Sequence, residues 1–414
     1  MRVRYIYSAC IVIETKDTRI CCDPWFSDGI YDGSWYQFPK VNDPIKSIGP
    51  IDFVFISHIH PDHYDPVWLR KLLDANPSCR LIIGAENQRH LERKMIRDGF
   101  SPELFKLLLV GSSQIACFPN FKNYSESIDS ALVVRQGNQS VVNMNDCSFD
   151  PEQVEAVSAF CTGSRIAAFL PYAGAGPYPQ RYMFTEEEVR QQEAQAKKEK
   201  FLNLFAQYVE ALNPEFAVPF AGLYFLGGSL ERFNNARGIP DAIEAAQMFP
   251  ERAITLQEVV GEINLDESVV FNQRTTQVDA REVSDYLRKY AAAALPYESD
   301  EPTSSDEIYE SLLVAAARAL ERSKLRIDAW ICLSLGNGTY GCVKPMDGVA
   351  VRLLDSIDAL SPREEIEIDQ RLLAGLLKRK YHWNNAEIGS HFEFRRFGMG
   401  YSKELYDFLS FLHI

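Results

Sequence analysis

The stretch His58-Ile59-His60-Pro61-Asp62-His63 decides the fold class that this chain predicts. It follows the apolar run 51–57, which predicts a buried strand. The polar residues then fall on a turn at the carboxyl end of that strand, where α/β sheets expose their functional groups. Imidazole and carboxylate groups are ligands of zinc, iron and similar ions. Three of the seven histidines of the chain lie in this stretch, so a chance grouping in an ordinary turn is the weaker explanation.

Carboxylates also end two other predicted strands. Residues 9–14 and 18–25 predict a strand pair that ends at Asp23-Pro24, and residues 140–146 predict a strand that ends at Asp146. With the histidine-rich turn between them, these strands resemble the metallo-β-lactamase superfamily. The resemblance implies an α/β fold, an αββα sandwich in which two sheets pack between helices and metals lie at one edge. It also implies that Asp23 does not bind a metal itself but fixes the orientation of the residues that do.

The same resemblance implies a set of metal ligands. His58 and His60 would bind one metal ion, and Asp62 and His63 would bind a second. Asp146 would bridge the two ions. Asp62, His63 and Asp146 would then be the groups nearest the reaction.

The sequence departs from the common hydrolases of this superfamily in its histidines. Those enzymes carry one more histidine before the bridging aspartate and another far downstream. Here the segment 120–129 has no histidine, and none occurs between His90 and His382. Ser125 and Glu126 lie where the first would be expected, and we expect them beside the metals. Water or Glu126 would complete the coordination.

The remaining ligands favour iron. His58, His60 and Asp146 form a two-histidine, one-carboxylate set, which non-haem iron oxygenases use because it leaves open positions for dioxygen and substrate. We therefore expect two metal ions with iron favoured, while zinc and manganese remain compatible with the ligands.

Further stretches across the chain resemble the metallo-β-lactamase-like part of the CMP-N-acetylneuraminate hydroxylase family. They are Asp23-Pro-Trp-Phe26, Gly33-Ser-Trp-Tyr36, Ile128 to Val134, Phe184 to Glu188, Pro219 to Gly222 and Gly389 to Arg396. That family uses dioxygen to hydroxylate the N-acetyl group of a nucleotide-linked sugar, and carries a Rieske domain with paired Cys-x-His segments. This sequence contains no such segments, so either a separate electron-transfer protein supplies the electrons or the reaction differs.

Two classes of function stay open at this point. The favoured one is a di-iron oxygenase or oxidase that acts on a polar small molecule, nucleotide-linked or amide-like. The alternative is a dinuclear hydrolase, in which a metal-bound hydroxide attacks an ester, amide or phosphodiester. A metal-free binding protein fits less well, because the ligand stretch and Asp146 are intact.

Three segments supply candidate substrate-binding residues. The loop 171–179 is rich in proline and small residues, which allow a ligand to approach the backbone. A second segment is 220–224, and a third is a polar C-terminal section, 382–396, which also holds His382 and Asn384. The candidates are Tyr172, Gly174, Gly176, Tyr224, His391 and Arg395. We expect the alternating stretch 391–395 to place His391 and Arg395 on one face of a strand, where arginine suits an anionic substrate. An ordinary loop and a surface strand are the alternatives.

Composition restricts the partners. A net charge of −14 disfavours nucleic acid, and no apolar run reaches the length of about 18 residues that a membrane span needs. Nine cysteines without a CxxC pair, and no apparent secretion signal, predict a cytoplasmic protein without a disulfide framework. The expected substrate is therefore a small molecule, and an anionic one is compatible with the sequence. No feature of the sequence sets an oligomeric state.

The chain divides into two predicted parts. Residues 1–245 form the metallo-β-lactamase-like domain and include a helix over 186–212. Residues 246–414 form a C-terminal α+β extension with an acidic linker candidate at 298–306. In the extension we expect helices over 307–323 and 364–379, with strands near 327–334 and 348–353.

Overall fold

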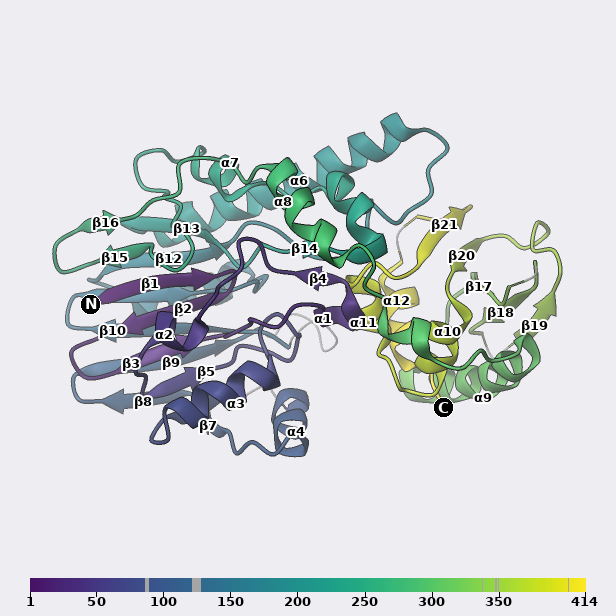
Figure 1. Cartoon of the computed structure of the whole chain (residues 1–414), viewed down its shortest axis with the longest axis horizontal. Helices are drawn as coiled ribbons and strands as arrows, with labels where there is room; N and C mark the ends of the chain where they lie inside the picture. The colour runs from purple at the N-terminus through teal and green to yellow at the C-terminus, as the bar shows by residue number, and fades with distance from the viewer. Residues whose placement is uncertain (86–88, 121–127, 337, 347, 349, 401) are drawn as a thin grey trace.

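Two lobes make up the structure (Figure 1). The computed structural model describes residues 1–85, 89–120, 128–336, 338–346, 348, 350–400 and 402–414. The larger lobe is a sandwich of two sheets between layers of helices, and the smaller lobe holds a separate sheet near the C-terminus. None of the described helices is both long and apolar enough to span a membrane.

The first sheet of the sandwich has eight strands. Their order is β16 (Val269–Phe271), β15 (Glu262–Asn264), β1 (Arg2–Tyr7), β2 (Cys10–Glu14), β3 (Arg19–Cys22), β5 (Phe53–Phe55), β6 (Arg80–Gly84) and β7 (Glu103–Phe105). From β16 to β3 the neighbours run antiparallel, and from β3 to β7 they run parallel. The carboxyl ends of β3 and β5 therefore lie side by side at one edge of the sandwich.

The second sheet has six strands. Their order is β13 (Phe216–Phe220), β12 (Arg165–Pro171), β11 (Gln139–Asn143), β10 (Ser130–Gln136), β9 (Ser113–Pro119) and β8 (Leu107–Val110). A short pair outside both sheets joins β4 (Trp35–Tyr36) to β14 (Phe225–Leu226).

Alternation of side chains along the strands explains the layers. On β2, Ile11 and Ile13 join the core between the two sheets, whereas Cys10 and Val12 pack on the outer face. The second sheet follows the same rule, because its strands divide their apolar residues between the inner core and an outer helical layer. Strands that are apolar on both faces require cover on both sides, and this gives the αββα order.

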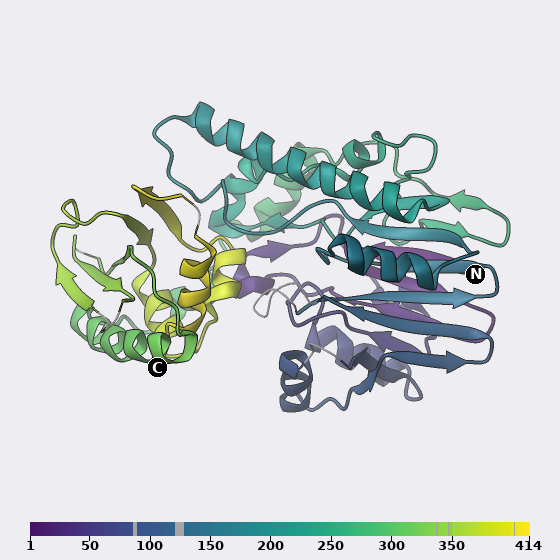
Figure 2. The ribbon, with the colours of Figure 1, turned by 180° about the vertical axis from the view of Figure 1, so that it is seen from behind.

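Helices cover both outer faces of the sandwich (Figures 1 and 2). The first sheet packs against α3 (Pro66–Ala75) and α4 (Arg89–Arg97). The second sheet packs against α5 (Pro151–Phe160), α6 (Glu187–Leu212) and α7 (Ala242–Ala246). The helix predicted over 186–212 is thus confirmed as α6. Shorter elements complete this lobe: α1 (Ile30–Gly33), α2 (Pro44–Ile48), η1 (Gly228–Ala236), α8 (Ala280–Leu287) and η2 (Arg288–Tyr290).

The smaller lobe is built on a five-stranded sheet. Its order is β19 (Ala350–Leu354), β18 (Tyr340–Lys344), β17 (Trp330–Ser334), β20 (Arg363–Glu367) and β21 (Glu393–Phe397). The helices of this lobe are α9 (Ser305–Ser323), α10 (Gln370–Leu377), α11 (Trp383–Ile388) and α12 (Lys403–Phe411), and the short helix η3 (Pro296–Ser299) precedes them in the chain. One apolar cluster runs from the first sheet through Leu295 and Tyr297 into this lobe.

Two details differ from the prediction. The boundary expected after residue 245 precedes β15 and β16, yet Ile263 of β15 pairs with Val3 of the first sheet. We therefore propose that the sandwich extends to the 298–306 segment. The helix expected over 364–379 was wrong in its first part, because 363–367 form the strand β20 and α10 begins only at Gln370.

Candidate metal centre

The ends of two strands bring the predicted ligands together. The strand β5 leads into the turn that carries His58, His60, Asp62 and His63. Asp146 follows β11 in the second sheet, so the site lies where the two sheets meet at one edge. The ligand atoms of His58, His63 and Asp146 lie within 4.8 Å of one another.

The ring nitrogens of the histidines face this common point. The Nε2 atoms of His58 and His63 each lie 3.6 Å from the same oxygen of Asp146, Oδ2. His58 Nε2 also lies 3.0 Å from His60 Nδ1, and His63 Nε2 lies 3.5 Å from Asp62 Oδ2. Imidazole nitrogens and carboxylate oxygens that converge in this way are an arrangement suited to metal ions.

Buried atoms without partners show that a metal would fit. His63 Nε2 and Asp146 Oδ1 are buried, and neither makes a hydrogen bond in the part of the chain that the structure describes. Polar atoms that are buried without a partner cost free energy, and coordination to a cation removes that cost. These two atoms belong to a residue expected to bind the second metal ion and to the residue expected to bridge the two ions.

Asp23 fixes the orientation of His63. It is completely buried, and its Oδ2 accepts hydrogen bonds from His63 Nδ1 at 3.0 Å and from Ser57 Oγ at 2.8 Å. Its Oδ1 accepts from the Ser57 backbone N–H at 2.8 Å. Because Nδ1 carries the donated proton, Nε2 presents its lone pair to the centre of the site, as a metal ligand must.

The pKa values of the two fully buried histidines are shifted in opposite directions. Burial lowers the pKa of His58 well below its usual value, and the neighbouring rings of His63 and His60 lower it further. This keeps His58 neutral. Burial also lowers the pKa of His63, but the carboxylates of Asp146, Asp62 and Asp23 outweigh burial and raise it well above the usual value. The carboxylates therefore favour a positive charge at this point, which a metal cation would supply.

The smaller lobe contributes side chains to the same site. Asn384 of α11 lies with its Oδ1 atom 3.0 Å from His60 Nε2. His391 donates from Nε2 to the Tyr31 carbonyl at 2.8 Å, and the Tyr31 hydroxyl donates to Asp62 Oδ1 at 2.5 Å. The C-terminal lobe thus contacts the ligands directly through Asn384 and indirectly through Tyr31.

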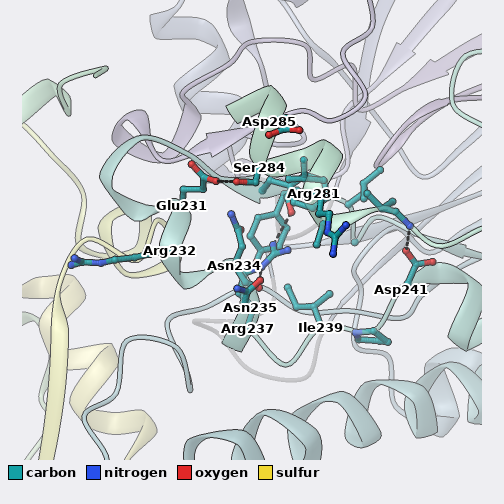
Figure 3. A pocket seen from close by; sticks show the side chains of 18 of the residues that line it. Glu231, Arg232, Asn234, Asn235, Arg237, Ile239, Asp241, Arg281, Ser284 and Asp285 are labelled. Carbon is teal, nitrogen blue, oxygen red and sulfur yellow. Dashed lines mark hydrogen bonds between the residues drawn. The ribbon is translucent and has the colours of Figure 1, made fainter. Parts of the chain in front are cut away.

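The predicted substrate-binding residues separate into two groups. Tyr172 and Tyr224 line a cavity of about 640 Å³ (Figure 3). Gly174 instead packs against α6, since a Cβ atom there would lie 2.1 Å from the Phe201 ring. Gly176 has a φ of 118° with no neighbour within 4 Å of an added Cβ, so backbone conformation alone accounts for the glycine.

His391 and Arg395 do not form the anion-binding face that the sequence suggested. His391 precedes β21 and is buried behind Tyr31, where the Tyr297 hydroxyl donates to its Nδ1 at 3.2 Å. Burial lowers the pKa of His391 to about 4. The Arg395 side chain is 42% exposed and lies 3.7 Å from Glu365. Ser125 and Glu126, expected beside the metals, lie outside the described residues.

Three further residues of the site do not stand out in the sequence. They are Ser57, Tyr31 and Trp35, and the Trp35 ring lies 4.5 Å from that of Tyr31. Ser57 directly precedes the histidine-rich stretch, so adjacency was a usable signal. The contact of Tyr31 with Asp62 depends on a left-handed backbone at φ 52°, which the sequence around a tyrosine does not indicate.

Comparison with known proteins agrees with this geometry. Residues 2–149 match the Beta-lactamase superfamily domain. The chain is 27% identical over 273 residues to a protein of Mycolicibacterium smegmatis that is named as a Rieske 2Fe-2S iron–sulfur protein, with 63% of this chain and 50% of that protein covered. It is 24% identical over 235 residues to the cytidine monophosphate-N-acetylneuraminic acid hydroxylase of Mus musculus, with 54% of this chain and 39% of that protein covered.

The chain therefore spans about half the length, or less, of these curated relatives. Among solved structures, CmlA, a diiron β-hydroxylase from Streptomyces venezuelae, shares 16% sequence identity at a TM-score of 0.40, with 60% of this chain and 49% of that chain covered. The family match contains every predicted metal ligand. This chain accordingly carries, at residues 2–149, a domain of the metallo-β-lactamase superfamily.

Proposed function

We propose that the protein is a di-iron oxygenase that hydroxylates a polar small molecule. The observation that carries this proposal is the scarcity of histidine at the centre. In the described part of the chain, the converging ligands are His58, His60 and His63 with the carboxylates Asp62 and Asp146. Such a carboxylate-rich set suits iron and leaves coordination positions open.

The reaction has a simple balance. One oxygen atom of dioxygen enters a C–H bond of the substrate as a hydroxyl group. The other leaves as water after taking up two electrons and two protons. Two bound iron ions would supply the activation of dioxygen. The electrons come from outside the chain, from an electron-transfer protein.

The residues of the chain hold and orient the centre. Asp23 keeps the proton of His63 on Nδ1, and this leaves Nε2 free to bind metal. The Tyr31 hydroxyl donates to Asp62 and fixes which carboxylate oxygen faces inwards. Burial of His58 and His63 excludes water from one side of the site.

The relatives support both the reaction and the partner. One of them is named as a hydroxylase and another as a Rieske iron–sulfur protein. A Rieske cluster is a one-electron carrier, so a separate protein of that kind fits the need for electrons. On this proposal the substrate is a nucleotide-linked or amide-like molecule.

The test begins with metal content. Protein expressed without added metal and purified anaerobically should contain about two irons per chain, as its ligand set favours. Dioxygen consumption is then measured with a chemical reductant and a panel of nucleotide-linked N-acetyl sugars and other amides.

Two variants make the measurement specific. His60→Ala should lose iron at one position and all dioxygen consumption, whereas His90→Ala, which replaces an exposed histidine on α4, should keep both. Two zinc ions with ester or phosphodiester cleavage and no dioxygen uptake would instead support the hydrolase alternative. Wild-type protein that binds no metal would contradict both.

A further inference from the structure

The cavity that Tyr224 lines contains an unusual density of arginine. Figure 3 shows it between η1 and α8, with Glu231, Arg237, Asp241 and Arg281 among the residues on its walls. Arg232 and Arg288 line it as well. The whole chain carries a net charge of −14, so its general field repels anions. This local group of arginines therefore opposes the field of the rest of the protein.

The carboxylates of the cavity already have partners. Asp241 accepts from Arg274 at 3.0 Å, and Asp285 lies 2.9 Å from Arg288. Glu231 accepts from the Ser284 hydroxyl at 2.6 Å. The Glu231–Ser284 contact joins η1 to α8, and in the described residues the other arginines of the cavity have no carboxylate within 4.0 Å.

Among the arginines of the cavity, Arg237 gives the strongest indication of an anionic ligand, because it is buried. Only 9% of it is exposed, and no carboxylate lies within 4.0 Å of its guanidinium in the described residues. The group donates from Nη1 to the Tyr224 carbonyl at 2.7 Å and from Nε to the Asn234 carbonyl at 3.2 Å. A guanidinium has five N–H donors, so most of its hydrogen-bonding capacity remains. A buried cation with no counter-ion is costly, and an anionic ligand would remove that cost.

Arg281 extends the positive surface. It lies on the first turn of α8, lines the same cavity and has no carboxylate within 4.0 Å among the described residues. Two guanidiniums that line one cavity without a carboxylate partner suit the oxygens of a carboxylate or a phosphate, which arginine binds bidentately.

Tyr224 connects the cavity to the metal centre. Its carbonyl accepts from Arg237, and the Arg237 guanidinium lies 4.6 Å from the centre of its ring. The same ring stacks on Trp35 at 3.5 Å, and Trp35 packs against Tyr31, which donates to Asp62. One aromatic wall therefore borders both the arginines and the metal ligands.

We infer that this cavity binds the oxyanion of the substrate, a carboxylate or phosphate, through Arg237 and Arg281. The neutral part of the molecule then lies along Tyr224 towards the metals. Binding of the anion needs only the arginines, whereas its role in catalysis rests on the proposed function.

The test measures anion binding by the full-length protein as purified. Inorganic phosphate and acetate are titrated separately at constant ionic strength against chloride, and the melting temperature is followed. At least one of them should raise it, and the one that raises it more identifies the oxyanion. Arg281→Gln should weaken that binding at least about tenfold, the effect of one charge-assisted hydrogen bond. Arg237→Gln should abolish it.

Controls separate anion binding in the cavity from anion binding at the metals or on the surface. Arg2→Gln, which replaces an exposed arginine of β1, should bind the anion as the wild type does. Asp146→Asn should retain anion binding even where metal is lost, because the cavity does not need the metals.

Loss of anion binding in Asp146→Asn would place the anion on the metals and overturn the inference. So would Arg281→Gln binding as tightly as the wild type, or no response to either anion. If the protein proves not to contain iron, the proposed oxygenase fails while the anion site still stands.

Discussion

Asn384 Oδ1 accepts a hydrogen bond from His60 Nε2 at 3.0 Å, between residues 324 positions apart in the sequence. His60 Nδ1 faces His58, so the outer nitrogen of the ring is held by the smaller lobe. Partners of this kind fix the tautomer and the orientation of a metal-binding histidine.

Asn384→Ala should therefore lower metal affinity roughly 10–100-fold, the usual effect of losing such a partner. Competition with a chelator, followed by metal analysis, measures this directly. The adjacent Asn385→Ala is the matched control, because the Asn385 side chain makes no hydrogen bond within the described residues. Equal metal affinity in both variants would show that Asn384 has no such role.

Asp65→Ala should destabilise the turn that carries the ligands. The buried Asp65 carboxylate accepts from the backbone N–H groups of Phe26 at 3.1 Å, Ser27 at 2.8 Å, Val67 at 3.1 Å and Trp68 at 3.2 Å. Leaving these donors without an acceptor should cost about 2–4 kcal/mol in the free energy of unfolding.

Urea unfolding measures this cost. Asp43→Ala, which removes the exposed cap of α2, is the control and should cost only about 0.5–1 kcal/mol. Equal losses in the two variants would mean that Asp65 acts only as a helix cap.

The stability of the protein should fall as the pH rises towards 8. Burial raises the pKa of Glu387 to about 8, and the carboxyls of Glu364 and Asp407 add to the rise. The folded state therefore holds this proton more tightly than the unfolded state. The stabilisation is complete below the ordinary glutamate pKa and is lost as the pH passes through about 8.

Glu387→Gln should remove this dependence and stabilise the protein at pH 9 by roughly 2 kcal/mol relative to the wild type. Urea unfolding at a series of pH values tests it. The exposed Glu404→Gln should leave the wild-type profile unchanged. A Glu387→Gln profile that still falls between pH 5 and 8 would assign the effect to another group.

Gly174→Ala should act on packing and not on substrate binding. The added methyl group would meet the Phe201 ring at 2.1 Å, and overpacking of this kind costs about 1–3 kcal/mol. The melting temperature should fall, and the added Phe201→Leu should restore part of it. A rise in KM with unchanged stability would return Gly174 to the substrate-binding residues.

Local sequence was enough to predict that the candidate ligands of the histidine-rich turn lie close together. His58, His60, Asp62 and His63 are adjacent, and their ligand chemistry is visible without any knowledge of the fold. Asp146 required more, because its place beside the histidines depends on the second sheet, and there the family resemblance supplied what the residues alone did not.

Residues recruited from far along the chain could not be predicted in the same way. Nothing near Asn384 specifies that α11 meets the histidine-rich turn, since that contact depends on the packing of two lobes. The strand β20 was missed for a different reason. Its Glu364 is completely buried and lies 3.6 Å from Arg396, so a charged residue occupies a core position that patterning assigns to a surface.

The contact between His60 and Asn384 also has a consequence for biosynthesis. His60 leaves the ribosome 324 residues before Asn384 of α11, and domains generally fold from the N-terminus as they emerge. The nascent sandwich can thus form while the outer nitrogen of His60 still faces water. The outer nitrogen of His60 gains its partner only after α11 has emerged, so the candidate metal centre is completed long after its histidine-rich turn has been synthesised.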